Sequence, residues 1–172
     1  MAGPDGTAGD GQRLVVLCGL PGVGKSTVAA MVTETLGATR LRTDVVRKEL
    51  FAEPAYSETE TEQVYEGLYE RARDRLEAGE SVVLDATFAR REYRSMSREL
   101  AATYDVSFSL VKVVCEASVV ERRLADREGV SDADRKVYRQ FREEFEPIGV
   151  DHAVVDNSGT PAETRAQVEA LF

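Results

Sequence analysis

The sequence has little of the chemistry that marks several classes of protein. His152 is the only histidine among 172 residues, which excludes a histidine-based catalytic triad and a zinc cluster built on histidines. Cys18 and Cys115 lie in apolar runs without CxxC spacing, so we expect small buried side chains and a reducing, cytoplasmic location. No run approaches the roughly 18 apolar residues of a membrane span, and the N-terminus lacks the apolar stretch of a signal peptide.

Lysine is also scarce, and the chain as a whole is acidic. Only Lys25, Lys48, Lys112 and Lys136 are lysines, and 22 basic against 31 acidic residues gives a formal net charge of −9. An acidic surface repels phosphate backbones, which disfavours a general nucleic-acid or anionic-membrane binder but leaves a local basic cleft open. No lysine stands in the [NT]KxD motif that reads guanine, which argues against a GTPase.

From Arg13 onward, apolar runs of strand length alternate with longer stretches of helical period. This alternation predicts βα units around a parallel sheet, within a single domain over residues 13–172. Residues 1–12 hold almost nothing apolar, and we expect a disordered tail there. The predicted strands cover residues 14–18, 38–42, 81–85, 106–115 and 152–156. The predicted helices cover residues 25–36, 44–51, 57–78, 90–103, 117–128 and 131–145, and a last one follows residue 160. Capping-box spacings at residues 57–60, 131–134 and 160–163 predict the starts of three of them.

The strongest motif follows the first predicted strand. Residues 19–26 read GLPGVGKS, which matches the phosphate-binding pattern G-x-x-x-x-G-K-[ST] and stands between a buried strand and a helix, as that pattern requires. Its glycines let successive backbone N–H groups point at one anion, and the helix adds its positive end. We expect Lys25 to bind the β- and γ-phosphates and Ser26 to bind Mg²⁺. The predicted nucleotide-binding residues of this segment are Gly19, Pro21, Gly22, Val23, Gly24, Lys25, Ser26 and Thr27.

Charged residues follow two further predicted strands. In an open parallel sheet the ligand lies beyond the carboxyl ends of the strands. Asp44 is a candidate base for an acceptor hydroxyl, or a cap of the short helix, and Arg47 projects from the same helix face. Asp85 ends an apolar strand like a Walker B carboxylate that holds Mg²⁺, or it simply starts a loop. Thr87 is a candidate contact for a substrate or phosphate.

Arginines cluster in two later helices. Arg123 and Arg127 are four residues apart and share a helix face, as in a lid that neutralises charge on a transferring phosphoryl group, with a solvated ion-pair face as the alternative. Arg90, Arg94 and Arg98 form a second stripe. That stripe predicts either a solvated face or a contact with the acceptor.

With these motifs the sequence resembles the P-loop kinases of the zeta-toxin and 5′-polynucleotide-kinase group. The likeness is carried by GLPGVGKST, by RTDVVRKELF from residue 42 and by VVLDATF from residue 82. It implies a three-layer P-loop NTPase fold, with a five-stranded parallel sheet ordered 2-3-1-4-5 and a helical lid, over about residues 14–172. It also implies that Asp44 is the base and that Arg47 grips the acceptor's phosphate or the transferring group. Arg127, with Arg123, would be the lid arginine, and Asn157 would lie in an adenine-side loop.

The sequence therefore predicts an ATP- and Mg²⁺-dependent kinase that transfers the γ-phosphate to a hydroxyl group. The acceptor is left open between a small molecule and a nucleic-acid 5′ end, although the net charge of −9 disfavours nucleic acid. The alternative is a nucleotide-gated ATPase or regulatory module without a small-molecule acceptor. No feature of the sequence predicts an oligomeric state.

Overall fold

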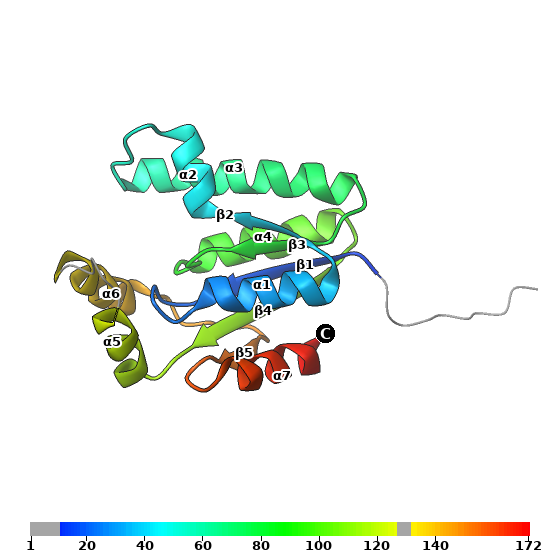
Figure 1. The fold of residues 1–172 in the computed structure, drawn as a ribbon. Helices are drawn as coiled ribbons and strands as arrows, with labels where there is room; N and C mark the ends of the chain where they lie inside the picture. The colour runs from blue at the N-terminus through cyan, green and yellow to red at the C-terminus, as the bar shows by residue number, and fades with distance from the viewer. Residues whose placement is uncertain (1–10, 127–131) are drawn as a thin grey trace, which may run out of the picture.

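The structure, a computed structural model, describes residues 11–126 and 132–172 and forms an α/β sandwich (Figure 1). Its strands are β1 (Arg13–Cys18), β2 (Thr39–Arg42), β3 (Val82–Asp85), β4 (Ser107–Val114) and β5 (Ala153–Asp156). Its helices are α1 (Lys25–Leu36), α2 (Thr43–Leu50), α3 (Glu58–Glu77), α4 (Arg91–Thr103), α5 (Ala117–Ala125), α6 (Asp132–Glu144) and α7 (Pro161–Leu171). Each described element agrees with its predicted range to within a few residues, the ordinary uncertainty at element ends.

The five strands form one parallel sheet in the order β2-β3-β1-β4-β5, which confirms the predicted P-loop NTPase topology. Strand β1 pairs with β3 and β4 on its two sides, and its residues from Leu14 to Cys18 are fully buried. A strand covered on both faces reads as a continuous apolar run. That is why the first strand could be recognised and placed centrally.

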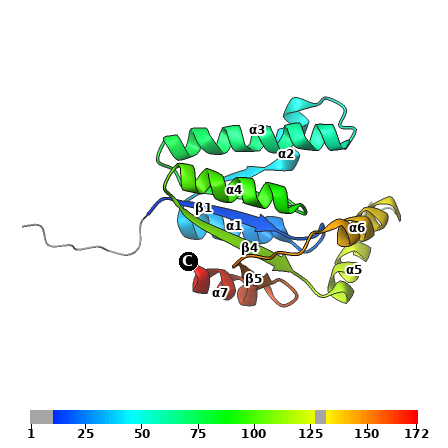
Figure 2. The same ribbon diagram turned by 180° about the vertical axis from the view of Figure 1, so that it is seen from behind.

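Helices cover both faces of this sheet. Figures 1 and 2 show α1 and α7 on one face and α3 and α4 on the other, with α5 and α6 beyond the end of the sheet. The apolar core is accordingly split into two clusters, one of which contains Leu68 and Phe88 and the other Val28 and Val168. Helices α5 and α6 lie at the end where β1 and β4 point. That position agrees with the predicted helical lid.

Two of the predicted capping boxes can be compared with the structure. Thr160 and Glu163 form a complete box at the start of α7, with Pro161 in the first turn. At the start of α3 the Ser57 side chain accepts from the Glu60 amide, as predicted, but the Glu60 carboxylate accepts from two upstream amides instead of returning to Ser57. The third predicted box, at residues 131–134, begins outside the described residues.

The start of the described chain is fixed to the rest of the domain by Gln12. Gln12, which the sequence places in the tail, donates from its side-chain amide to the carbonyl oxygens of Leu76 and Glu80, each at 2.7 Å.

Cys18 is fully buried, and this burial raises the pKa of its thiol to about 11. Cys115 is half-buried, and both cysteines are free. Across residues 11–126 and 132–172, no helix is both long enough and apolar enough to cross a membrane.

Candidate nucleotide and acceptor site

The glycine-rich segment forms a tight loop between β1 and α1. Gly22 and Gly24 adopt φ values of 86° and 88°, which side chains with a Cβ rarely tolerate. Helix α1 begins directly after Gly24, with no side-chain cap and no acidic residue in its first turn. The positive end of the helix is therefore not neutralised by its own sequence, which suits it to bind an anion.

Lys25, the first residue of α1, is held within this loop. Its Nζ donates to the Leu20 carbonyl oxygen at 3.0 Å. Burial lowers the pKa of Lys25 to about 8, and the negative charge of Asp85 partly opposes this shift. A desolvated ammonium gains more from a phosphate anion than one in bulk water, because little solvent screens the pair.

A cavity of about 460 Å³ adjoins the loop. It lies between the start of α1, helix α5 and the segment that follows β5. Its lining residues are Gly22, Gly24, Lys25, Ser26, Thr27, Arg123, Leu124, Asn157, Gly159 and Pro161. The structure thus brings most of the residues predicted to bind the nucleotide into one cavity.

Arg123 belongs to this cavity from the side of α5. Its Nη2 donates to the Asn157 carbonyl oxygen at 2.8 Å, and its Nη1 lies 3.6 Å from Cys115 Sγ. These contacts tie the guanidinium to the segments that follow β4 and β5. Arg127, the other predicted lid arginine, lies outside the described residues.

Thr87 and Asn157, which come from other strand ends, also meet the loop. The Thr87 carbonyl oxygen accepts from the Gly19 amide at 3.1 Å, so the segment after β3 is fixed to the start of the phosphate loop. The Asn157 side chain is buried and donates to the Val23 carbonyl oxygen at 2.9 Å. Asn157 is therefore turned inward, toward the back of the loop.

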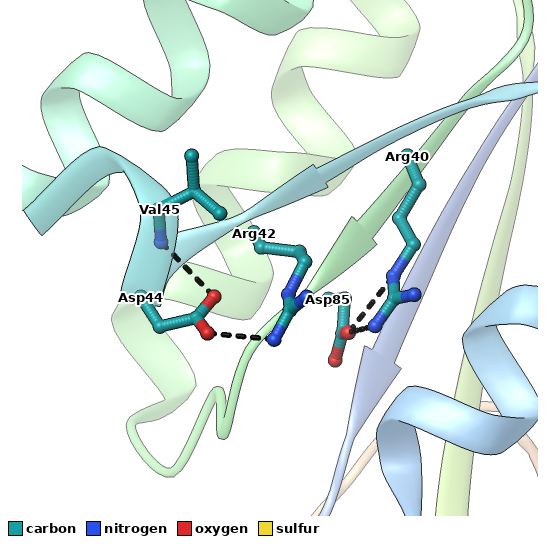
Figure 3. Close-up of polar contacts among 5 residues, drawn as sticks. All are labelled: Arg40, Arg42, Asp44, Val45 and Asp85. Carbon is teal, nitrogen blue, oxygen red and sulfur yellow. Dashed lines mark hydrogen bonds and ion pairs between the residues drawn. The ribbon is translucent and has the colours of Figure 1, made fainter. Parts of the chain in front are cut away.

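Asp44 lies in the first turn of α2, which follows β2 at the same end of the sheet as the phosphate loop. Its side chain is 52% exposed, and Arg42 Nη2 lies 2.6 Å from Asp44 Oδ2 (Figure 3). Asp44 Oδ1 also accepts from the amide of Val45 at 3.0 Å. The N-cap of α2 is Arg42, without a side-chain cap hydrogen bond, so Asp44 is not the helix cap that the sequence allowed. Its carboxylate is held by local contacts yet remains open to solvent, which is compatible with an accessible base.

Asp85 is only 6% exposed at the end of β3, and it forms an ion pair with Arg40 of the neighbouring strand. The Nη2 and Nε atoms of Arg40 lie 2.6 Å and 3.1 Å from Asp85 Oδ2 (Figure 3). Sequence reasoning missed Arg40. The available signal was its spacing of two from Arg42, which places both guanidiniums on one face of β2, next to β3.

Asp85 and Ser26 are the residues predicted to hold a magnesium ion. In the part of the chain that the structure describes, no three His, Cys, Asp or Glu side chains gather closely enough to hold a metal. Mg²⁺ in nucleotide sites commonly takes only one or two carboxylates and completes its shell with water and substrate phosphates. The donor set of Asp85 and the exposed Ser26 hydroxyl fits that kind of site. These two residues would hold the ion, which supplies charge neutralisation at the phosphates.

Arg47 is engaged in a network that orders the segment before α3. Its Nη1 lies 2.5 Å from Glu60 Oε1, its Nη2 donates to Thr61 Oγ1 at 3.2 Å, and its guanidinium lies 4.7 Å from the centre of the Tyr56 ring. Glu60 also accepts from the amides of Ala55 and Tyr56. Burial alone would raise the pKa of Glu60, but these amides and Arg47 outweigh it and lower that pKa. The predicted contact of Arg47 with an acceptor therefore remains a prediction.

Arg94 has neither of its two predicted environments. It is 5% exposed and donates to the carbonyl oxygens of Phe88, Glu146 and Pro147. Its guanidinium thereby joins the segment after β3 to the segment that leaves α6. Arg90, by contrast, is about half exposed and pairs with Glu58 at 2.6 Å.

The parallel sheet, the loop and the cavity define a P-loop nucleotide-binding protein. The chain belongs to the AAA domain family, whose sequence profile matches residues 14–148. It is 36% identical over 140 residues to uncharacterized proteins of Mycobacterium bovis (Mb2027c) and Mycobacterium tuberculosis (Rv2004c). That match covers 73% of this chain but only 28% of each relative, so the chain spans little more than a quarter of their length.

Solved structures of kinases share this fold. A sugar kinase from Janibacter sp. HTCC2649 superposes with a TM-score of 0.74 at 22% identity, over 92% of this chain and 93% of that one. The Mycobacterium tuberculosis APS kinase CysC, in complex with AMPPNP and APS, superposes with a TM-score of 0.73 at 22% identity, over 94% of this chain and 97% of that one. These neighbours establish the P-loop kinase fold, and nothing in them singles out the zeta-toxin or polynucleotide-kinase group.

Proposed function

We propose that the protein is an ATP- and Mg²⁺-dependent kinase that transfers the γ-phosphate to a hydroxyl group. The observation that carries the proposal is the order β2-β3-β1. This order sets the phosphate loop after β1 beside Asp85 after β3 and Asp44 after β2. Ligands of open parallel sheets bind beyond these carboxyl ends. A triphosphate on the loop and a hydroxyl near Asp44 would therefore occupy one continuous edge.

Each residue has a defined task in this proposal. Lys25 and the amides at the start of α1 bind the phosphates, and Ser26 and Asp85 support the metal. Asp44 orients the acceptor hydroxyl and receives its proton as the oxygen attacks the γ-phosphorus, while ADP leaves. The accessibility of its carboxylate, half exposed beside Arg42, supports this role.

A small-molecule acceptor is the version of this proposal that we favour. The fold shared with the Janibacter sugar kinase supports it, and the net charge of −9 opposes the long-range attraction of a nucleic acid. The ion pairs Arg40–Asp85, Arg42–Asp44 and Arg47–Glu60 also give each of these guanidiniums a carboxylate of its own. A neutral polyol would bind there without displacing any of those pairs.

The test is a transfer screen with γ-labelled ATP and Mg²⁺ against sugars, nucleosides, aminoglycosides and 5′-hydroxyl oligonucleotides. The proposal predicts label on at least one hydroxyl compound and transfer that is slower by about 100-fold or more in the Asp44→Asn variant. Steady ATP hydrolysis that no acceptor changes would instead favour a nucleotide-gated module. Transfer to oligonucleotides alone would overturn the preference for a small molecule.

A further inference from the structure

Asn157 lies where four segments of the chain meet. Its contacts indicate a role that the proposed kinase activity does not itself specify. The residue follows β5 and is 7% exposed. Its amide donates to the Val114 carbonyl oxygen at 2.8 Å, and its own carbonyl oxygen accepts from Arg123. Its side chain is bound at both ends, to Val23 of the phosphate loop and to Thr164 of α7.

The bond to Val23 determines which way one loop amide points. Asn157 Nδ2 donates to the Val23 carbonyl oxygen at 2.9 Å. That oxygen and the N–H of Gly24 belong to the same trans peptide, in which the two groups point in opposite directions. With the oxygen drawn toward buried Asn157, the Gly24 N–H is directed to the other side of the loop. Backbone N–H groups of such loops are the donors that hold phosphate oxygens.

Gly24 is matched to this arrangement. Its φ of 88° is one reason for glycine at this position. A second reason is space, because a Cβ on Gly24 would overlap with Nδ2 of Asn157. The loop glycine and the distant asparagine are thus packed against each other, and a larger residue at position 24 would displace the Asn157 side chain.

Thr164 holds the other end of the Asn157 carboxamide. Its hydroxyl donates to Asn157 Oδ1 at 2.9 Å, and Thr164 is fully buried in α7. The Val23 carbonyl oxygen can only accept, so it requires the NH₂ group on its side, and the carboxamide oxygen then faces the Thr164 hydroxyl. Helix α7 therefore takes part in shaping the phosphate loop, although it contributes no residue of the motif.

We infer that Asn157 is a positioning residue of the phosphate site, which holds the Val23–Gly24 peptide in the orientation that binds a triphosphate, with Thr164 as its support. The inference rests on the proposed function to the extent that the loop binds a triphosphate. It assigns Asn157 to the back of the loop and not to an adenine contact.

The test compares Asn157→Ala, Thr164→Val and Thr164→Ser with the wild-type chain. Inorganic triphosphate, which has no adenine, and ATP are each titrated calorimetrically with Mg²⁺, and the melting temperature of each variant is recorded without ligand. Loss of one hydrogen bond should weaken both affinities about tenfold in Asn157→Ala and a few-fold in Thr164→Val. Thr164→Ser keeps the hydroxyl and should bind like the wild type.

The outcomes separate a positioning role from the alternatives. An adenine contact would weaken ATP binding and leave inorganic triphosphate unchanged, which would overturn the inference. A folded Asn157→Ala variant with wild-type affinity for both ligands would overturn it as well. Should Asn157→Ala fail to fold, the comparison of Thr164→Val with Thr164→Ser decides the question. Absence of ATP binding in the wild-type chain would instead contradict the proposed function itself.

Discussion

Arg40 on β2 and Asp85 on β3 form an ion pair in which Nη2 and Nε lie 2.6 Å and 3.1 Å from one carboxylate oxygen (Figure 3). The Arg40 side chain is 21% exposed and that of Asp85 is 6% exposed. Pairing makes a nearly buried carboxylate tolerable beside the phosphate loop, because an unpaired charge there would keep its full desolvation cost. The other oxygen of the carboxylate stays available for the proposed metal.

We therefore predict that Arg40→Ala lowers the free energy of unfolding by about 2–3 kcal/mol, because it leaves Asp85 unpaired. Urea denaturation at neutral pH measures this loss. The matched control is Arg165→Ala, which breaks the exposed pair of Arg165 with Glu34 and should cost less than about 1 kcal/mol. In an Arg40→Ala, Asp85→Asn double variant, most of the loss should be recovered. Additive losses would show that the two residues are not coupled.

The lowered pKa of Glu60 predicts a pH dependence of stability. Its pKa falls below the ordinary value of 4.5 in the folded chain, because the amides of Ala55 and Tyr56 and the Arg47 guanidinium favour the carboxylate. The stabilisation is therefore complete above the unfolded pKa and is lost as the pH falls through the folded value.

A Glu60→Gln variant should accordingly be less stable than the wild type at pH 7, and the difference should shrink as the pH falls below about 4.5. Urea denaturation of both chains between pH 7 and pH 3 measures it. A gap that stays constant over this range would mean that the charge of Glu60 does not stabilise the segment before α3.

Local sequence patterns account for most of the fold. The continuous apolar run of β1 and the strand–loop–helix context of residues 19–26 are features of short segments, which a sequence displays directly. The partners of Arg40 and Asn157 are not local. They depend on strand register and on packing between residues as much as 134 positions apart, as for Asn157 and Val23. The residue types were visible, but nothing short-range specified whether each would face a ligand or the protein itself.

The position of Arg123 changes the kinetic effect expected when its side chain is removed. The sequence suggests a lid arginine at the transferring phosphoryl group, while the structure ties the guanidinium to the Asn157 carbonyl oxygen in the cavity wall. We predict that Arg123→Ala raises KM for ATP about tenfold and changes kcat less than about threefold. The reason is that Arg123 would stabilise bound ATP equally in the ground state and in the transition state.

Steady-state kinetics with varied ATP and the acceptor identified by the transfer screen measure both constants. The control is Arg122→Ala, since Arg122 is exposed on the same helix and should be neutral when removed. A fall in kcat at unchanged KM would return Arg123 to the role that the sequence suggested.

Asp44 should act on turnover and not on nucleotide binding. Asp44→Asn keeps the shape of the side chain and an oxygen for the Val45 amide but removes the proton acceptor. We predict a loss of about 100-fold or more in kcat, as expected for a general base, with ATP affinity unchanged by calorimetry. Glu49→Gln, an exposed substitution on the same helix, serves as the control. Full activity of Asp44→Asn would remove Asp44 from the proposed chemistry.

The most direct test of ATP binding at the phosphate loop is calorimetric titration of the wild-type chain and of Lys25→Ala with ATP, with and without Mg²⁺. Among the described residues, the one hydrogen-bond partner of Lys25 Nζ is the loop carbonyl of Leu20, so removal of the side chain should leave the fold intact while removing the charge proposed to bind the phosphates. We predict one saturable site in the wild type that Mg²⁺ strengthens, and at least about a tenfold weaker site in Lys25→Ala. Absence of ATP binding by the folded wild-type chain, or equal affinity in both chains, would contradict the proposal that the loop and Lys25 bind ATP.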